Sequence, residues 1–261
     1  MEDHHRESIR LFLRRYQSDP NLLAVLMGGS LAHGYARPDS DIDLLLLVEE
    51  GEFARRKSEK KLTFSVLDIC TYPGGYIDCK VIDLPFINQV IRNGSDPARY
   101  AFQDAEILFS RLDTLPALLA GATAFPVAKK ASRRERFAAQ VLAWKWYYGE
   151  GRKRNNAYLL SLAVQKLVLF SCRLILNENE MLYPFHKWLL RETQKAPHKP
   201  LGFDNSLQQL LTEHDQALVN GFCEAMLTFL DLDEVALDWA NHFIRDSEMN
   251  WLDGEPPVDD L

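Results

Sequence analysis

Short apolar runs separated by charged or glycine-rich breaks fill the first 112 residues of the chain. Apolar positions at helical spacing predict a helix over 5–18, which Asp19-Pro20 ends. Apolar or alternating runs predict strands over 22–27, 42–48, 62–71, 76–82 and 105–110. We interpret the charged stretch 49–61 as a loop and 72–75 as a turn. The pattern predicts an α/β domain, of the α+β kind, with a small mixed sheet and flanking helices.

From residue 113 onward the apolar spacing is helical and strand signals nearly vanish. Helices are predicted at about 113–121, 131–149, 156–177, 184–195, 205–231 and 233–248. This change marks a domain boundary at 112–125, with 122–127 as the linker. We therefore predict a mixed domain over 1–121 and an all-helical bundle over 122–252. The acidic tail 253–261 carries two prolines and is expected to be disordered.

The composition is that of an ordinary globular protein, with 47% hydrophobic and 26% charged residues. Uninterrupted apolar runs stay far below the ~18 residues of a membrane helix. The polar N-terminus lacks the apolar core of a signal peptide, so we expect a cytoplasmic protein without a membrane partner. The four cysteines form no C-x-x-C pair and are interpreted as buried free thiols, at Cys70, Cys79, Cys172 and Cys223.

Charge is distributed unevenly along the chain, whose net charge is −7. Residues 1–154 hold 23 Lys/Arg against 20 Asp/Glu, whereas residues 155–261 hold 7 against 17. The negative total argues against nucleic acid as a partner. The slightly basic first part suits an anionic ligand, and the acidic second part would favour a cationic one.

One stretch, GGSLAHGYARPDSDIDLLLL, carries the chemistry. Two glycines after a strand let the backbone approach a ligand closely, and Ser30 is expected to begin a short helix as its N-cap. Such a turn binds phosphate through backbone N–H groups. Asp41 and Asp43 then lie two apart at the start of an apolar strand and should project together. Two carboxylates this close repel unless a cation lies between them, and oxygen ligands favour Mg²⁺.

This arrangement resembles the nucleotidyltransferase superfamily that includes DNA polymerase beta and the aminoglycoside nucleotidyltransferases. The family pattern is Gly-Ser, then Asp-x-Asp, then a third carboxylate on a later strand. Gly29-Ser30 and Asp41/Asp43 match the first two parts. One departure is His33, where many relatives place arginine.

Asp78, within a predicted strand, is the best match for the third carboxylate. Its competitors are Asp68, which has less polar company on its strand face, and Asp83, which falls at a strand end. Fused family members also carry an all-helical C-terminal domain, which resembles the second half of this chain.

The resemblance implies a two-metal active site for nucleoside triphosphates. Asp41, Asp43 and Asp78 would be catalytic residues that hold two Mg²⁺ ions, and Asp78 is also a candidate base. Gly29 and Ser30 would bind the triphosphate of ATP or another nucleotide. Two further nucleotide-binding candidates have simpler alternatives. For Arg37 the simpler interpretation, a solvated turn residue, is favoured. Lys187 is equally readable as a surface lysine beside core aromatics.

The implied function is transfer of a nucleoside monophosphate, AMP from ATP, to a hydroxyl of a small molecule, with release of pyrophosphate. Aminoglycoside- and lincosamide-modifying enzymes of antibiotic resistance are the nearest analogues. Two alternatives stay open. One is adenylylation of a protein, as in toxin–antitoxin nucleotidyltransferases, and the other is a catalytically inactive nucleotide-binding module.

Overall fold

The computed structural model describes residues 1–213 and 215–255, and the chain divides into two compact units. Unit 1 comprises Met1–Ala124 and unit 2 comprises Phe125–Leu261. Two hydrophobic clusters form the core of unit 1, and a third forms the core of unit 2. The predicted disordered tail falls largely on residues 256–261, which lie outside the described part of the chain.

The strands of unit 1 form one mixed sheet of order β3-β4-β2-β1-β5. β2 and β4 are parallel, and the other neighbouring pairs are antiparallel. The strands are β1 (Leu22–Met27), β2 (Ile42–Val48), β3 (Thr63–Val66), β4 (Ile77–Ile82) and β5 (Glu106–Ser110). The mixed sheet, followed by a helical region, confirms the predicted fold class.

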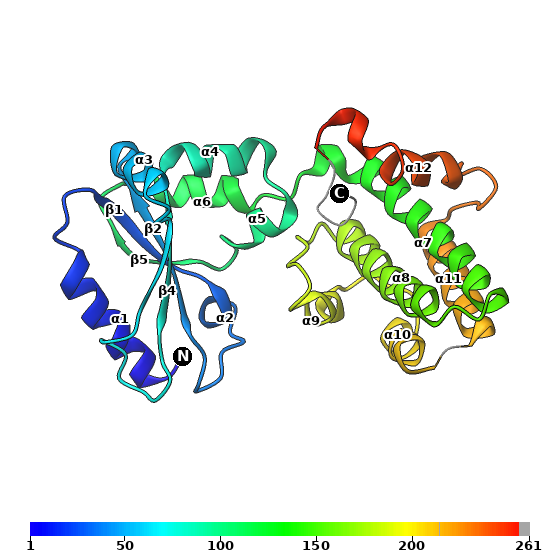
Figure 1. Cartoon of the computed structure of the whole chain (residues 1–261), viewed down its shortest axis with the longest axis horizontal. Helices are drawn as coiled ribbons and strands as arrows, with labels where there is room; N and C mark the ends of the chain where they lie inside the picture. The colour runs from blue at the N-terminus through cyan, green and yellow to red at the C-terminus, as the bar shows by residue number, and fades with distance from the viewer. Residues whose placement is uncertain (214, 256–261) are drawn as a thin grey trace. The chain divides into compact units, whose positions relative to one another are not determined.

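Helices cover both faces of this sheet (Figure 1). α1 packs Ile9 and Phe12 onto one face, and α4 and α6 cover part of the other face with Ile87 and Leu115. The helices of unit 1 are α1 (Asp3–Tyr16), α2 (Gly29–Ala32), α3 (Glu50–Ser58), α4 (Leu84–Asn93), α5 (Asp96–Tyr100) and α6 (Leu115–Thr123). Because α4 and α6 cover one end of their face, the other end is left for polar side chains.

A buried arginine links the last residues of unit 1 to the end of α4. Arg99, at the end of α5, is 5% exposed and donates hydrogen bonds to carbonyl groups of three segments. Its acceptors include Ile91 O at 2.9 Å, Gly94 O at 3.1 Å and Ala124 O at 3.2 Å. One guanidinium therefore fastens the ends of α4 and α6 together, as its planar array of donors allows.

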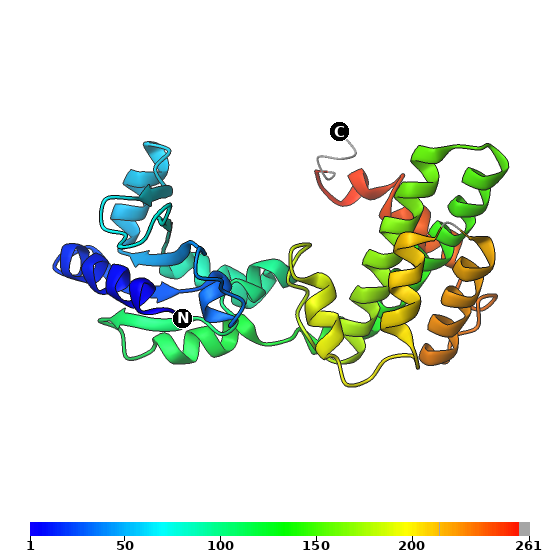
Figure 2. The same cartoon turned by 90° about the horizontal axis from the view of Figure 1, so that it is seen from below.

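Unit 2 is helical, and the antiparallel pair α7 and α8 forms its centre (Figures 1 and 2). Asn156 caps α8 by accepting from Leu159 N, and Asp215 caps α11 by accepting from Ala217 N. The α-helices are α7 (Lys130–Lys153), α8 (Ala157–Glu178), α9 (Leu189–Lys195), α10 (Phe203–Thr212), α11 (Gln216–Leu230) and α12 (Trp239–Asp246), with short 3-10 turns η1 (Val127–Lys129) and η2 (Asn250–Asp253).

α8 is long and apolar enough to cross a membrane. Half of its most apolar window is nevertheless buried inside unit 2, where Leu167, Cys172 and Leu174 are fully buried. A core helix passes the same test of length and composition, and burial accounts for the apolar character of α8. Cys79 and Cys223 are likewise buried free thiols, as predicted, and Cys70 is half-buried.

Several predicted elements differ from the structure. The predicted loop 49–61 contains α3, and the predicted strand 62–71 pairs only over Thr63–Val66. The helix predicted from 184 begins at Leu189, and the helix predicted over 205–231 is two helices, α10 and α11. The helix predicted at 233–248 is confined to Trp239–Asp246. α4 and α5 had no predicted counterpart.

Candidate active site

Two aspartates face each other where β2 and β4 begin. The strands run parallel in register, with Ile42 beside Ile77 and Asp43 beside Asp78. Ile42 and Ile77 are buried on the α1 face, so strand alternation places Asp43 and Asp78 on the opposite face. Further along the same face, Leu47 and Ile82 lie under α4 and α6. The carboxylates thus occupy the uncovered end of this face.

A lysine lies between these two carboxylates. Lys80 Nζ is 3.4 Å from Asp43 Oδ1 and 3.6 Å from Asp78 Oδ2. Lys80 follows Asp78 by two positions on β4, so both side chains share one face. Sequence reasoning missed this residue, although the alternation Asp78-Cys79-Lys80 was the available signal. The site therefore already holds one cation shared by two carboxylates.

Asp41 adds a third negative charge that acts on Asp43. It lies just before β2 and accepts a hydrogen bond of 2.9 Å from Tyr76 Oη, which raises the pKa of Tyr76. Burial raises the pKa of Asp43, and the charges of Asp41 and Asp78 add to this effect while Lys80 opposes it. Asp43 is thus held where its negative charge is disfavoured unless a cation is near. Tyr76 is a second residue that sequence reasoning missed.

Gly29 brings the backbone against Asp43. It has φ +62°, and a Cβ atom built there would lie 1.9 Å from Asp43 Oδ2. Gly28 N also donates a hydrogen bond of 3.0 Å to Asp43 O. The carboxylate therefore rests in a space that only glycine leaves open.

Ser30 differs from its predicted position. The N-cap of α2 is Gly28, so Ser30 is a helical residue, and α2 is a single turn of four residues. The Ser30 side chain is 6% exposed, and its Oγ has no hydrogen-bond partner in the described part of the chain. A buried hydroxyl without a partner is costly, and a ligand oxygen beside it would satisfy it.

The competing third carboxylates are engaged elsewhere. Asp68 forms a bidentate pair with Arg15 of α1, at 2.9 and 3.0 Å. Asp83 is buried and caps α4, accepting a 2.8 Å hydrogen bond from Phe86 N. Asp78 is the one of the three that stands beside Asp43.

Arg37 and Lys187, the other two proposed nucleotide-binding residues, each have a different close contact within their own unit. Arg37 lies in an exposed turn, where its guanidinium pairs with Asp39 at 3.0 Å. Lys187 belongs to unit 2, in the turn before α9, with its Nζ 5.1 Å from the centroid of the Trp188 ring. His33 binds Asp104 at 3.1 Å and stacks on Tyr100.

The carboxylates fit Mg²⁺ as part of a site that the substrate completes. Within residues 1–213 and 215–255, no three acidic, His or Cys side chains are grouped closely enough to hold an ion unaided. Asp43 and Asp78 nevertheless share one cationic partner, and Mg²⁺ binds one or two carboxylates together with substrate phosphates. The unpartnered Ser30 hydroxyl lies in the adjoining α2 turn, against which Asp43 packs.

The sheet, the Gly-Ser turn and the paired aspartates define a class of protein. Residues 6–77 match the nucleotidyltransferase domain family. The match includes Gly29, Ser30, Asp41 and Asp43, and it ends one residue before Asp78. Unit 1 therefore carries a region that matches a nucleotidyltransferase domain, and this match supports a transferase activity.

The chain is also similar to solved structures. A nucleotidyltransferase-like protein from Exiguobacterium sibiricum is similar with a TM-score of 0.50 and 12% identity, covering 94% of this chain and 80% of that one. Spectinomycin adenyltransferase AAD(9) from Enterococcus faecialis, solved with ATP and spectinomycin, has a TM-score of 0.35 and 14% identity. That alignment covers 86% of this chain and 98% of the other. No protein of curated function matches the sequence.

Proposed function

We propose that the protein transfers a nucleoside monophosphate, AMP from ATP, to a hydroxyl group of a small molecule of the aminoglycoside or lincosamide type. One observation carries the proposal. Asp43 and Asp78 pair at the starts of two parallel strands, beside the turn at Gly29 and Ser30. Acidic side chains of the kind that bind Mg²⁺ thus lie next to a buried hydroxyl and a glycine turn, an arrangement that would serve phosphoryl transfer.

In the proposed reaction the acceptor oxygen forms a bond to the α-phosphorus of the nucleotide. The bond from that phosphorus to the oxygen that bridges to the β-phosphate breaks, and pyrophosphate leaves with the electron pair. Asp78 is the proposed acceptor of the hydroxyl proton. The Ser30 hydroxyl would donate a hydrogen bond to a phosphate oxygen, which satisfies its buried polar atom.

Asp41, Asp43 and Asp78 are the residues that would hold Mg²⁺, with two ions in the proposal. Bound there, the metal would neutralise triphosphate charge and lower the pKa of the attacking hydroxyl. Lys80 contacts two of these carboxylates and must release at least one of them to make room for the ion. Released toward the substrate, its ammonium group would face phosphate oxygens.

The charge distribution favours an acceptor molecule that is positively charged. Residues 155–261 hold 7 Lys/Arg against 17 Asp/Glu, and such an excess attracts polycations. Calorimetry with an aminoglycoside, Mg²⁺ and a non-hydrolysable ATP analogue tests this form. Binding should weaken as salt rises; binding of neutral acceptors only, or of transfer RNA, would contradict it.

The test of the function is a pyrophosphate-release screen. ATP, GTP, CTP and UTP are each offered with Mg²⁺ against a panel of aminoglycosides and lincosamides, and mass spectrometry identifies the product. We expect acceptor-dependent pyrophosphate release and an acceptor that gains the mass of AMP. Adenylylated protein instead of a modified small molecule would favour the protein-directed alternative. Nucleotide binding without any transfer would favour the inactive module.

Matched variants assign any activity to the site. Asp41→Asn removes a proposed metal ligand and should lower the rate on the order of a thousandfold or more. Asp113→Asn removes an exposed acid of the same unit and should leave the rate unchanged. Near-normal turnover of Asp41→Asn with Mg²⁺ would contradict the assignment.

A further inference from the structure

Three aromatic side chains of unit 1 lie together beside the turn that leads to Asp41. His4 and His5 belong to the first turn of α1, and Tyr72 lies between β3 and β4. The ring centroid of Tyr72 is 4.5 Å from that of His4 and 5.0 Å from that of His5. His5 is fully buried. The transfer chemistry proposed above uses none of these three side chains.

Two of the three side chains donate to the same carbonyl group. Tyr72 Oη donates to Ser40 O at 2.8 Å, and His5 Nε2 lies 3.1 Å from the same oxygen. A carbonyl oxygen only accepts, so His5 Nε2 carries the proton, and Nδ1 accepts from Glu2 N at 3.3 Å. Burial lowers the pKa of His5 and raises the pKa of Tyr72 to about 12. Near pH 7 the imidazole is therefore neutral, and the Tyr72 hydroxyl keeps its proton.

The Ser40 carbonyl controls the backbone of Asp41. It belongs to the planar peptide unit that ends in Asp41 N, so two donors on this oxygen fix the plane of that unit. On the other side of Asp41, Ile42 N donates to Tyr76 O at 3.1 Å. Both peptide units that flank Asp41 are thus held in place, and Tyr76 Oη holds the carboxylate itself at 2.9 Å.

The start of α1 also holds the rest of the turn 37–40. His4 Nε2 lies 2.9 Å from Pro38 O and donates to it. Thr71 Oγ1 donates to His4 O at 3.1 Å, which links the same helical turn to the segment that carries Tyr72. Residues 37–39 are exposed, so apolar packing contributes little to their order. These polar contacts therefore set the position of the turn.

We propose that His5 and Tyr72 are positioning residues of the metal site, which hold the Ser40 carbonyl so that the Asp41 carboxylate faces Mg²⁺. The inference rests on the proposed function, in which Asp41 is a metal ligand. Groups that orient a ligand contribute to metal affinity without touching the ion. A turn that is already ordered also loses less entropy when Mg²⁺ and the nucleotide bind.

Tyr72→Phe tests the first donor, because it removes the hydroxyl and keeps the ring that packs on the two histidines. Calorimetry on the full chain in Mg²⁺ measures binding of an ATP analogue that cannot be cleaved between the α- and β-phosphates. We expect binding to weaken about tenfold. Tyr16→Phe is the matched control and should leave the affinity unchanged. It removes a hydroxyl at the other end of α1, where Tyr16 packs on Phe12.

Two substitutions of His5 test the second donor. His5→Leu removes the hydrogen bond to Ser40 O and should weaken binding of the analogue about tenfold. His5→Gln keeps an N–H group that can reach the same oxygen, and should retain most of the native affinity. Should His5→Leu fail to fold, as judged by circular dichroism, Tyr72→Phe decides the matter.

Melting temperatures in EDTA separate positioning from a purely structural role. If Tyr72 only stabilised the fold, Tyr72→Phe would lower the melting temperature in EDTA and bind the analogue with native affinity. That result, or equal weakening of binding by Tyr16→Phe, would overturn the inference. Weaker binding in Asp41→Asn together with native binding in Tyr72→Phe would overturn the inference alone. Absence of Mg²⁺-dependent binding in the native protein would overturn the proposed function as well.

Discussion

At Gly29 the space that one methyl group would need is taken by the Asp43 carboxylate. A Cβ atom there would lie 1.9 Å from Asp43 Oδ2, whereas one at Gly34 would meet nothing within 4 Å. Both glycines have positive φ, +62° and +71°. Both positions therefore require a left-handed backbone conformation, and they differ only in the atoms that surround them.

Gly29→Ala should abolish transfer, because the new methyl group must displace the Asp43 carboxylate. Gly34→Ala is the matched control, since it imposes a similar left-handed strain of roughly 1 kcal/mol without a collision. Both variants should lose stability in urea unfolding, and Gly29→Ala should lose more. Full activity in Gly29→Ala would show that Asp43 need not remain where it is.

Asp43 should also make the metal-free protein less stable as pH rises. Burial, with two neighbouring carboxylates, raises the pKa of Asp43 in the folded state, so the folded protein binds this proton more tightly than the unfolded chain does. The free energy of unfolding then falls as pH rises through and above the ordinary range of a carboxyl.

Asp43→Asn removes this penalty. In EDTA the variant should therefore gain stability relative to the native protein at pH 7, and the gain should shrink toward pH 4. Urea unfolding at the two pH values measures it. A loss of stability at pH 7 would mean that the contact with Lys80 outweighs burial.

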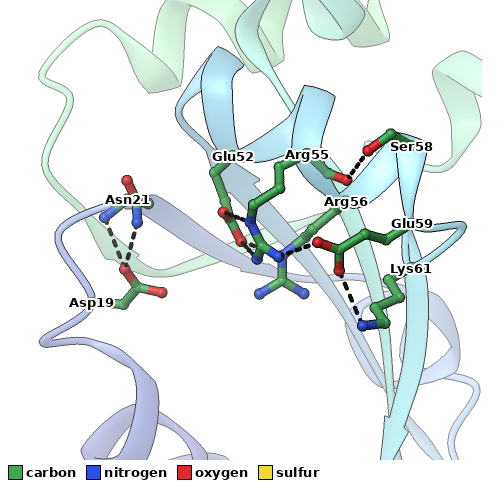
Figure 3. Close-up of polar contacts among 8 residues, drawn as sticks. All are labelled: Asp19, Asn21, Glu52, Arg55, Arg56, Ser58, Glu59 and Lys61. Atoms are coloured by element: carbon green, nitrogen blue, oxygen red, sulfur yellow. Dashed lines mark hydrogen bonds and ion pairs between the residues drawn. The ribbon is translucent and has the colours of Figure 1, made fainter.

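At the scale of elements, α3 shows where the sequence pattern misleads. The stretch 49–61 has few apolar residues and was predicted as a loop, yet Glu50–Ser58 is helical. Figure 3 shows the reason: Glu52 binds Arg55 and Arg56, and Glu59 binds Arg55 and Lys61. Most of these partners are three or four residues apart, a spacing at which opposite charges support a helix. A search for apolar periodicity does not detect such pairs.

Glu52→Gln tests this network. Hydrogen bonds from Arg55 and Arg56 lower the pKa of Glu52 to about 2, so its ionised form stabilises the fold above the ordinary carboxyl range. The variant should lose about 1 kcal/mol at pH 7, and the difference should shrink as pH falls toward 2. Glu59→Gln, at a more exposed position, should lose less. Equal stability of Glu52→Gln and the native protein in urea at pH 7 would contradict this role.

The carboxylates of the site were predictable because strand alternation and the glycine turn are local signals. Asp41, Asp43 and Asp78 could be named from spacing and family pattern alone. The alternation with Asp78 placed Lys80 on the same strand face, but the contacts of Lys80 and Tyr76 with the carboxylates depend on β2 and β4 being neighbours, which the sequence alone does not show. The boundaries of α10 and α11 were missed because the apolar pattern continues across the break that Asp215 caps.

At the scale of the molecule, Lys187 tests whether unit 2 contributes to triphosphate binding. If it contacts the triphosphate, Lys187→Ala should raise the apparent KM for ATP several-fold and leave the melting temperature unchanged. Lys166→Ala is the matched control, because Lys166 also lies over a tryptophan of unit 2, Trp144, at 5.9 Å. A fall in melting temperature with unchanged ATP kinetics would identify Lys187 as a surface residue that packs on Trp188.

The parallel pairing of β2 with β4 has a consequence for the order of folding. The chain forms α3 and β3 between β2 and β4, so β2 and β4 are distant in sequence. In contrast, α7 and α8 pack together and follow each other directly along the chain. Contacts between distant residues form late, and a slip of one residue would turn Asp78 into the α1 core. During refolding from urea, the helical signal should therefore return before the capacity for transfer. Simultaneous recovery of both would show that the sheet forms as early as the helices.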